Sequence, residues 1–188
     1  MPALRGRAGG GAMMDEQRGR AGDGPPRRFA LEAGVIAGVV AVDQATKLLV
    51  RAEVPIHGSV PVIPDLLNIV HVRNTGAAFG FLNAVDFPYK AAVVALVATA
   101  ALIGIALYAA RMSSHERLAR VGLALILGGA VGNLIDRLAL GSVVDFVDVV
   151  LGGWHFWAFN VADSAITVGV VAMLADMIGL DRHVSSTV

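Results

Sequence analysis

The chain has 188 residues, of which 56% are hydrophobic and 16% charged, and its formal net charge is zero. With a mean hydropathy of +0.68 it is too apolar for an ordinary soluble domain, and it has no charge excess that would attract nucleic acid. It contains no cysteine, which excludes disulfides, thiol catalysis and cysteine metal sites. The composition indicates an integral membrane protein.

The first 28 residues differ from the rest of the chain. They are rich in Gly, Arg and Pro and lack an apolar pattern, so we expect residues 1–28 to form a disordered cytoplasmic tail. They do not read as a signal peptide, because the first apolar run begins only at Phe29. Residues 29–180 are expected to form one membrane domain, followed by a cytoplasmic tail at 181–188.

Four later stretches are each about long enough to cross the roughly 30 Å hydrocarbon core as a helix. Lys and Arg gather before the first stretch and between the second and third, which predicts that both termini are cytoplasmic and that the two longer connections face outward. The expected fold is therefore an all-α integral membrane protein with four transmembrane helices. The four stretches are residues 29–50, 89–110, 117–138 and 159–180.

The connection between the first two predicted helices carries a different pattern. From Arg51 to Pro88, Val and Ile alternate with polar residues, and Pro61 and Pro64 interrupt the run. Such alternation predicts a small strand-rich element on the extracytoplasmic side of the membrane. In the connection between the third and fourth helices, Trp154 and Trp157 are expected to mark the outer membrane interface.

Acidic residues of three predicted helices fall at one depth. At a rise of about 1.5 Å per residue, Asp43 lies about 21 Å and Asp136 about 28 Å from the cytoplasmic side, and Asp163 lies about 6 Å below the outer side. All three therefore lie in the outer third of a hydrocarbon core about 30 Å thick. The sequence predicts a polar cluster near the outer surface.

Local spacing predicts how some of these groups pair. Asp43 and Lys47 stand four residues apart on one helical face, where they can form an ion pair. We also expect the neighbours Asp136 and Arg137 to pair with each other, and Asp136 to support the scaffold rather than perform chemistry.

Two glycine pairs have the spacing that lets membrane helices approach closely. Gly34 and Gly38 form one such pair, and Gly128 and Gly132 form the other. Helix packing is the expected use of both.

Asp145 and Asp163 are carboxylates at similar depth in apolar surroundings. Two close carboxylates in a low dielectric share a proton, which is the arrangement that aspartic peptidases use. Three uses remain open from the residues alone: a catalytic pair, a structural hydrogen-bonded cluster, and an ion or proton pathway.

A serine nucleophile, Ser164, activated by Lys47 is a poorer alternative, because Ser164 points away from the face of Asp163. The five histidines are scattered and predict no metal site.

Five short motifs together resemble the motif set of the lipoprotein signal peptidases, also called signal peptidase II. They are "DQATK" (43–47), "NTGAAFG" (74–80), "GNLIDR" (132–137), "VVDF" (143–146) and "FNVADS" (159–164), in the order of that family. The resemblance implies an aspartic endopeptidase of the bacterial inner membrane that needs no cofactor. Its substrates would be prolipoproteins that carry diacylglycerol on a cysteine, cut just before that cysteine.

The same resemblance implies roles for individual residues. The catalytic pair falls on Asp145 and Asp163, and Gly76 is expected to permit a turn that brings Asn74 to the substrate. Membrane lipid would be the other partner, and we expect a monomer. The substrate-binding or supporting residues implied are Asp43, Lys47, Asn74, Gly76, Asn133, Asp136, Arg137 and Asn160.

A channel or a proton-coupled transporter component is the alternative function. Asp43, Asp136 and Asp163 would then act as relay groups across the membrane. A relay needs ionisable groups along its whole path, whereas the inner halves of the last three predicted helices hold almost none except Asp176. This distribution favours the peptidase.

Overall fold

The computed structural model describes residues 26–76, 87–112 and 116–179. The chain divides into two compact units, residues 1–31 and 32–188. Of the first unit only the beginning of one helix is described. Of the tails expected at 1–28 and 181–188, residues 1–25 and 181–188 lie outside the described residues, whereas residues 26–28 belong to that helix. All contacts discussed below belong to the second unit.

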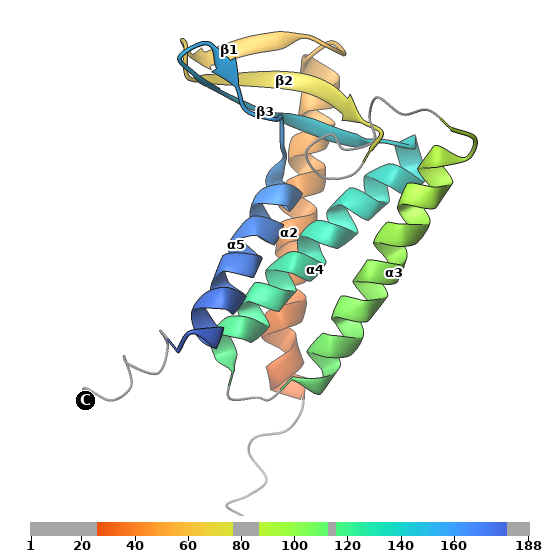
Figure 1. Cartoon of the computed structure of the whole chain (residues 1–188), viewed down its shortest axis with the longest axis vertical. Helices are drawn as coiled ribbons and strands as arrows, with labels where there is room; N and C mark the ends of the chain where they lie inside the picture. Colours follow the sequence, from red (N-terminus) through yellow and green to blue (C-terminus); the bar gives the residue numbers. More distant parts are fainter. Residues whose placement is uncertain (1–25, 77–86, 113–115, 180–188) are drawn as a thin grey trace, which may run out of the picture. The chain divides into compact units, whose positions relative to one another are not determined.

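Four long helices run side by side in the second unit, the first of them from Glu32 onward (Figure 1). They are α2 (Pro26–Glu53), α3 (Lys90–Arg111), α4 (Arg117–Leu140) and α5 (Val161–Met177). The four expected helical stretches are thus confirmed, although α2 begins at Pro26, ahead of the expected start at Phe29. Three helices are long and apolar enough to span a membrane, namely α2 from Ala30, α3 and α4. Helix α5 has 17 residues.

Helix α4 is the centre of the packing, because it lies against both α3 and α5. Gly122 of α4 and Gly169 of α5 face each other so closely that a Cβ atom on either would overlap the other's carbonyl oxygen. Gly129 of α4 is equally close to the carbonyl oxygen of Ala162. These glycines allow backbone-to-backbone contact between α4 and α5.

The expected glycine pairs behave differently from each other. A Cβ atom at Gly128 would lie 2.9 Å from Val39, and one at Gly132 would lie 2.5 Å from an Asp43 carboxylate oxygen, so this pair brings α4 against α2. Among the described residues, Gly34 and Gly38 have no neighbour within 4 Å of such an atom. The expectation that Gly34 and Gly38 pack closely against another helix is therefore wrong for the described helices, because none of them approaches this face of α2.

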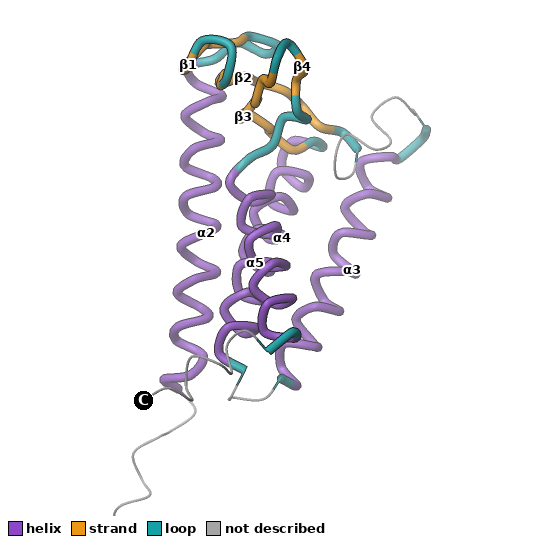
Figure 2. The backbone as a smooth tube through the Cα atoms, turned by 60° about the vertical axis from the view of Figure 1, so that its left-hand side comes forward, coloured by secondary structure: helices purple, strands orange, loops and turns teal. Residues whose placement is uncertain are grey.

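A four-stranded antiparallel sheet lies at one end of the helices (Figure 2). Strands β1 (Ser59–Ile63) and β2 (Leu67–Asn74) follow α2, which confirms the strand-rich segment between the first two helices. Strands β3 (Val143–Leu151) and β4 (Trp154–His155) come from the connection between α4 and α5, and β3 pairs with β2. The expectation of an all-α fold with one strand-rich connection was thus too narrow, since both long connections build the sheet.

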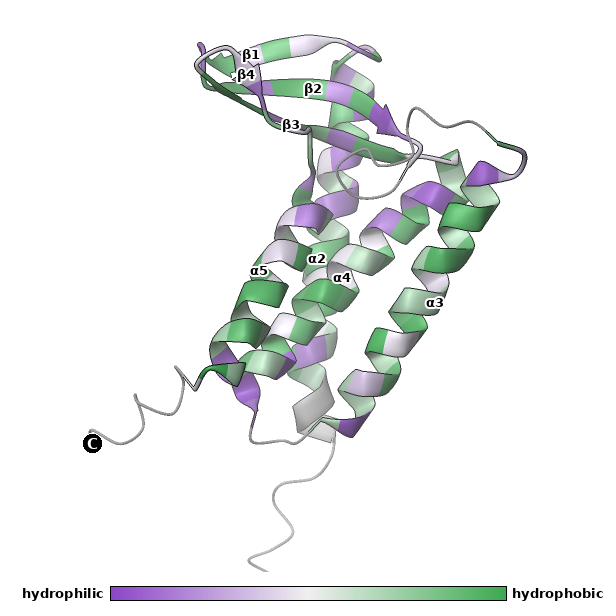
Figure 3. Cartoon of the chain, in the orientation of Figure 1, coloured by the Kyte–Doolittle hydropathy of each residue, from purple (hydrophilic) through white to green (hydrophobic). Residues whose placement is uncertain are grey.

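The sheet is joined to the helices by a small apolar core. Val50 and Val54 at the end of α2 pack with Val144 and Phe146 of β3. Side chains alternate along a strand, so Asp145, between these two, points to the opposite face of β3. Figure 3 shows hydrophilic colour gathered on the helix ends nearest the sheet, above largely hydrophobic helix bodies.

Candidate active site

Asp163 lies in the first turn of α5 and helps to begin that helix. Asn160 is the N-cap residue, and its side-chain oxygen accepts a hydrogen bond from the Asp163 backbone N–H at 3.0 Å. In return, Asp163 Oδ2 accepts from the Asn160 backbone N–H at 3.2 Å, which completes a capping box. Asp163 Oδ1 accepts from Asn133 Nδ2 of α4 at 2.9 Å. The carboxylate is therefore held on both oxygens.

Asp145 lies on β3 with only 3% of its surface exposed. Its Oδ1 accepts from Asn160 Nδ2 at 2.8 Å and its Oδ2 from Asn74 Nδ2 at 3.1 Å. Burial raises the pKa of Asp145 to about 7, and the charge of Asp163 adds to the rise against the opposing hydrogen bonds from Asn74 and Asn160. At neutral pH, this carboxyl group is therefore divided between its protonated and ionised forms.

Asn160 joins the two carboxyl groups. Its side-chain amide donates to Asp145 and its backbone N–H donates to Asp163, so the two acids lie on either side of one residue. Asp145 is buried, whereas Asp163 is partly exposed. Asp145 is thus sheltered from solvent, whereas Asp163 can contact water. Such a difference in environment allows one acid of a pair to be protonated while the other is ionised.

A buried lysine lies beside this pair. Lys47 of α2, with 1% of its surface exposed, places its ammonium nitrogen 2.8 Å from Asp43 and 3.3 Å from Asp136. The same nitrogen donates to Asn133 Oδ1 at 2.9 Å. The expected Asp43–Lys47 ion pair is confirmed. Lys47 also brings Asp43 and Asp136 together, as expected of acidic residues that lie at the same depth on different helices.

The expected Asp136–Arg137 ion pair is wrong. Neighbouring residues on a helix point in different directions, and the ion pair recorded for Asp136 in the described part of the chain is with Lys47. Arg137 instead donates to two backbone oxygens, that of Gly76 at 3.1 Å and that of Asn133 at 3.4 Å. The scaffold role expected of Asp136 fits its contacts, since its Oδ2 also accepts from the Val144 backbone N–H at 3.0 Å.

Gln44 is a member of this network that the sequence analysis missed. Its amide nitrogen is 3.2 Å from both Asp43 Oδ2 and Asp136 Oδ1 and 3.1 Å from the Gly132 carbonyl oxygen. A glutamine inside an otherwise apolar helix needs hydrogen-bond partners, and that requirement was the available signal. Asp43 also ties α2 to α5, because its Oδ1 accepts from the Ala162 backbone N–H at 3.0 Å.

The turn after β2 reaches the site as expected. Asn74 Oδ1 accepts from the Gly76 backbone N–H at 3.0 Å, which closes a turn around Thr75 and leaves Asn74 Nδ2 directed at Asp145. The remaining residues of that motif, 77–80, lie outside the described residues. All ten residues expected at the site are therefore joined by recorded contacts.

The alternative chemistries find no matching geometry. Ser164 is exposed, and its hydroxyl donates to the Asn160 carbonyl oxygen at 2.9 Å, while Lys47 is engaged by Asp43, Asp136 and Asn133. Across the described ranges, no three His, Asp or Glu side chains converge so that they could hold a metal ion.

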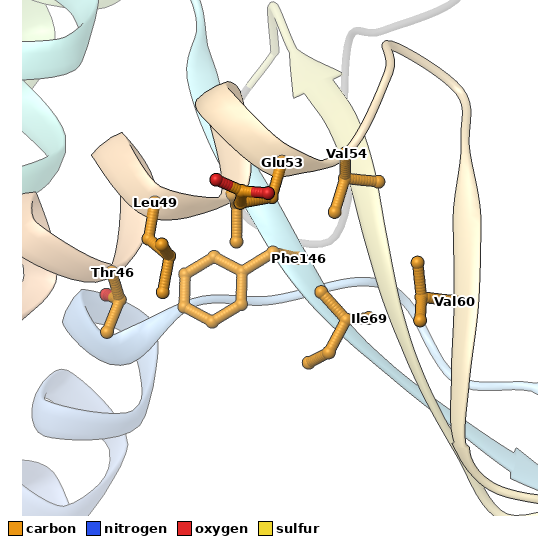
Figure 4. Close-up of a pocket in the computed structure, with 8 residues that line it drawn as sticks. Thr46, Leu49, Glu53, Val54, Val60, Ile69 and Phe146 are labelled. Atoms are coloured by element: carbon orange, nitrogen blue, oxygen red, sulfur yellow. The ribbon is translucent and has the colours of Figure 1, made fainter.

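An apolar groove of about 410 Å³ lies where the end of α2 meets the sheet (Figure 4). Phe146 forms part of its wall, and the hydroxyl of Thr46 is turned to the carbonyl oxygens of Val42 and Asp43. The groove therefore offers mainly apolar contact beside β3, with Glu53 as its one charged lining residue (Figure 4). Its lining residues are Thr46, Leu49, Val50, Glu53, Val54, Val60, Ile69 and Phe146.

Comparison with known proteins gives one consistent answer. A family model described as "Signal peptidase (SPase) II" matches residues 35–179. The lipoprotein signal peptidase of Geobacter metallireducens is 46% identical over 151 residues, which cover 80% of this chain and 92% of that protein. That of Geobacter sulfurreducens is 47% identical over 149 residues, covering 79% and 92%.

Two solved structures share the fold. A bacterial membrane enzyme determined by the in meso method at 2.3 Å resolution superposes with a TM-score of 0.69 at 33% identity, covering 85% of this chain and 92% of that chain. A second, at 1.9 Å resolution, gives a TM-score of 0.71 at 32% identity, covering 80% and 94%. The helices and the sheet thus form an arrangement already seen in bacterial membrane enzymes.

Proposed function

The chain belongs to the signal peptidase II family of aspartic peptidases, and from this premise we propose that Asp145 and Asp163 are its catalytic pair. The protein is a multi-pass membrane peptidase that removes signal peptides from prolipoproteins. Family membership also decides against the channel or transporter component. The observation that carries the assignment of the pair is that Asn160 donates to both carboxyl groups at once.

The burial of the two acids suggests separate roles. Asp163 is partly exposed, so it can contact a water molecule and, when ionised, take a proton from it as the water oxygen attacks the scissile carbonyl carbon. Asp145 is buried, and its raised pKa favours the protonated form, which can donate its proton to the carbonyl oxygen. The product of this step is a neutral diol on the former carbonyl carbon.

The second step reverses the roles. Asp163 gives its proton to the departing nitrogen while the C–N bond breaks, and Asp145 takes back the proton of a diol hydroxyl as the new carboxyl group forms. Both acids return to their starting states. The hydrogen bonds from Asn74, Asn133 and Asn160 keep both carboxyl groups in place throughout.

The substrate is a prolipoprotein that carries diacylglycerol on a cysteine, and the cut falls before that cysteine.

Four helices, including the shorter α5, cross the bacterial inner membrane, with both termini cytoplasmic and the sheet outside. The Lys and Arg distribution supports this orientation, and the exposed Trp154 and Trp157 suit an outer interface. The protein acts as a monomer and needs no cofactor, and residues 1–28 and 181–188 are cytoplasmic tails.

The direct test uses the purified protein in detergent and a prolipoprotein modified with diacylglycerol. We expect release of the signal peptide and a mature product whose first residue, by mass spectrometry, is the lipidated cysteine. Heat-denatured enzyme serves as the control. A product that begins at another residue would contradict the proposed cut, and intact substrate would contradict the proposed function.

A further inference from the structure

Lys47 has an environment that the proposed chemistry does not use. Lys47 is almost completely buried, and its ammonium group contacts Asp43, Asp136 and the side-chain oxygen of Asn133. Within the described part of the chain, this group makes no hydrogen bond or ion pair with Asp145 or Asp163. A buried ammonium group is stable only when its donors are matched in this way. Asp43 and Asp136 lead on to the backbone N–H groups of Ala162 and Val144. Asn133, in contrast, leads directly to a carboxylate of the proposed pair, that of Asp163.

The side chain of Asn133 stands between Lys47 and Asp163. Its Oδ1 accepts from the Lys47 ammonium group at 2.9 Å and from Asn160 Nδ2 at 3.2 Å. Its Nδ2 donates to Asp163 Oδ1 at 2.9 Å. One amide thus links a buried cation on α2 to the carboxylate on α5.

The two ends of an asparagine amide have nearly the same shape, so its partners decide which end points where. An ammonium group can only donate hydrogen bonds, and an ionised carboxylate can only accept them. In the reversed orientation, the Asn133 NH₂ group would face the Lys47 ammonium group and its oxygen would face Asp163. Both contacts would then be repulsive. Lys47 therefore favours the orientation in which Asn133 donates to Asp163, and Asn160 Nδ2, which also donates to Asn133 Oδ1, favours the same orientation.

We propose that Lys47 is a positioning residue that acts through Asn133 to hold Asp163 for catalysis. The proposal rests on the role of Asp163 proposed above. Lys47 does not exchange a proton with substrate or water. It fixes one amide, and that amide fixes the carboxylate that receives the proton of the attacking water.

A purely structural role for Lys47 makes a different prediction. It would stabilise the junction of α2 and α4 through Asp43 and Asp136, and its loss would only lower the fraction of folded enzyme. A positioning role predicts a loss in kcat per folded molecule with little change in KM, because the group that is misplaced acts in the chemical step. The fold-change expected for a misplaced catalytic group is on the order of 10- to 100-fold.

The test is a double-mutant cycle in kcat between Lys47→Met and Asn133→Leu, using the modified prolipoprotein. Rates are divided by the folded fraction measured by size-exclusion chromatography. If Lys47 acts through Asn133, adding Lys47→Met to Asn133→Leu lowers kcat no further. If the two losses multiply, the proposal is overturned.

Gln44→Met is the matched control on the same helix. Gln44 contacts Asp43, Asp136 and the Gly132 carbonyl oxygen but not Asn133 in the recorded contacts. We expect it to lower the thermal midpoint and to show no coupling to Asn133→Leu, so that any loss it causes in kcat per folded molecule multiplies with the loss caused by Asn133→Leu. Coupling as strong as that of Lys47 would assign the effect to the whole network and overturn the specific role.

Lys47→Met leaves two carboxylates without their cation and can fail to fold. The cycle is then repeated in an Asp136→Asn background, which removes one of these charges and keeps an oxygen for the Val144 N–H. Independently, Asn133→Asp keeps an acceptor for Lys47 but removes the donor to Asp163, so we expect a folded protein with strongly reduced kcat. Full kcat in Asn133→Asp would overturn the proposal.

These outcomes distinguish a failure of the role proposed for Lys47 from a failure of the proposed peptidase function. If wild-type enzyme cleaves and Asp163→Asn does not, but the cycle is multiplicative, only the role of Lys47 fails. If wild-type enzyme does not cleave the modified substrate, the proposed function fails as well.

Discussion

Asp145 and Asp163 each need to exchange a proton in the proposed reaction, and an amide cannot do so. We therefore expect Asp145→Asn and Asp163→Asn each to abolish cleavage of the modified prolipoprotein. Both variants should still insert into the membrane and fold, because asparagine keeps the size of the side chain. The measurement is product formation by gel shift, with size-exclusion chromatography as the control for folding. Near-normal turnover by either variant would remove that residue from the pair.

The raised pKa of Asp145 makes a separate prediction about stability. Burial raises this pKa to about 7 in the folded protein, so between about pH 4 and pH 7 the folded state retains a proton that the unfolded chain has released. The free energy of unfolding therefore falls as the pH rises through this window. The full effect is on the order of a few kcal/mol.

Asp145→Asn removes the carboxyl group that titrates in this window. The thermal midpoint of the variant in detergent should therefore change less between pH 4.5 and pH 7.5 than that of the wild type. At pH 8 the variant should be the more stable of the two, as is common when a strained functional group is replaced. Thermal melts at constant ionic strength measure both effects. Parallel pH profiles for the two proteins would show that Asp145 ionises in the folded state as it does in the unfolded chain.

At the residue level, the sequence indicated which polar residues gather near the sheet, but it predicted few of the contacts among them. The pair Asp43–Lys47 was predictable because both residues lie on one helix at a fixed spacing. The contacts of Lys47 with Asp136 and Asn133 join different helices, and no local spacing contains that information. The wrong Asp136–Arg137 pairing came from treating nearness in sequence as nearness in space, although consecutive helical residues diverge.

At the level of elements, β3 was not predicted. Its sequence, "VVDFVDVVL", has the β-branched residues of a strand, but the sequence analysis used it only as the apolar surroundings of Asp145. Strand pairing depends on a partner, and the partner here is β2, about 70 to 80 residues earlier in the chain. The strand places Asp145 opposite Val72 and beside Asn74, so the missed element carries one member of the proposed catalytic pair.

Asp136 connects three elements and should matter for stability more than for chemistry. It pairs with Lys47 of α2, and its Oδ2 accepts from the Val144 N–H of β3. Removing one partner of a buried ion pair costs about 3–5 kcal/mol. We expect Asp136→Ala to lower the thermal midpoint in detergent markedly, and more than Asp145→Asn does. Equal midpoints for the two variants would mean that Asp136 does not hold the elements together.

The contact between α4 and α5 depends on glycines that leave no room for a side chain. A methyl group at Gly129 would overlap the Ala162 carbonyl oxygen, so the helices would have to separate. Such overpacking typically costs about 1–3 kcal/mol. We expect Gly129→Ala to lower the thermal midpoint and to reduce cleavage, because Ala162 is next to Asp163.

Gly38→Ala is the matched control, since nothing lies within 4 Å of the added atom. Alanine also favours the helix over glycine by about 1 kcal/mol, so this variant should be as stable as the wild type or slightly more stable. If Gly129→Ala and Gly38→Ala melt at the same temperature, close contact of α4 with α5 is not needed for the fold.

At the scale of the whole molecule, the helices were predictable because a long apolar window is a property of composition alone. The shorter α5 shows what composition omits. Its 17 residues extend about 26 Å at 1.5 Å per residue, less than the roughly 30 Å core. In the proposed four-span arrangement, the chain before α5 must therefore enter the outer membrane level without being helical.

Non-helical backbone at that depth is tolerated only where protein satisfies its polar groups. The residue before the N-cap of α5 meets this condition, because the Phe159 carbonyl oxygen accepts from the Phe146 and Val147 N–H groups and its own N–H donates to Val147. The sheet thus supplies the hydrogen bonds that a longer helix would have made. This arrangement explains why a carboxylate can lie one turn inside an apolar helix and still meet water.

Selectivity for lipid follows from where this site lies. The described helices present many exposed apolar side chains, and the groove beside β3 is lined almost wholly by apolar groups. For the substrate proposed above, binding should therefore come mainly from apolar contact with the acyl chains and the signal helix, at about 0.8 kcal/mol per buried CH₂ group. Binding energy that is used to place the scissile bond against Asp145 and Asp163 raises kcat as well as affinity.

We therefore expect the same prolipoprotein without diacylglycerol on its cysteine to be cleaved very poorly, even in the same membrane at the same concentration. Modified and unmodified substrates are compared side by side by gel shift over a time course, and both must be shown to insert equally. The unmodified substrate should remain slow at saturating concentration, because the missing acyl chains would have served positioning and not only binding. Equal rates would mean that the signal helix alone sets the position of the scissile bond, and that the lipid contributes nothing that the two aspartates can use.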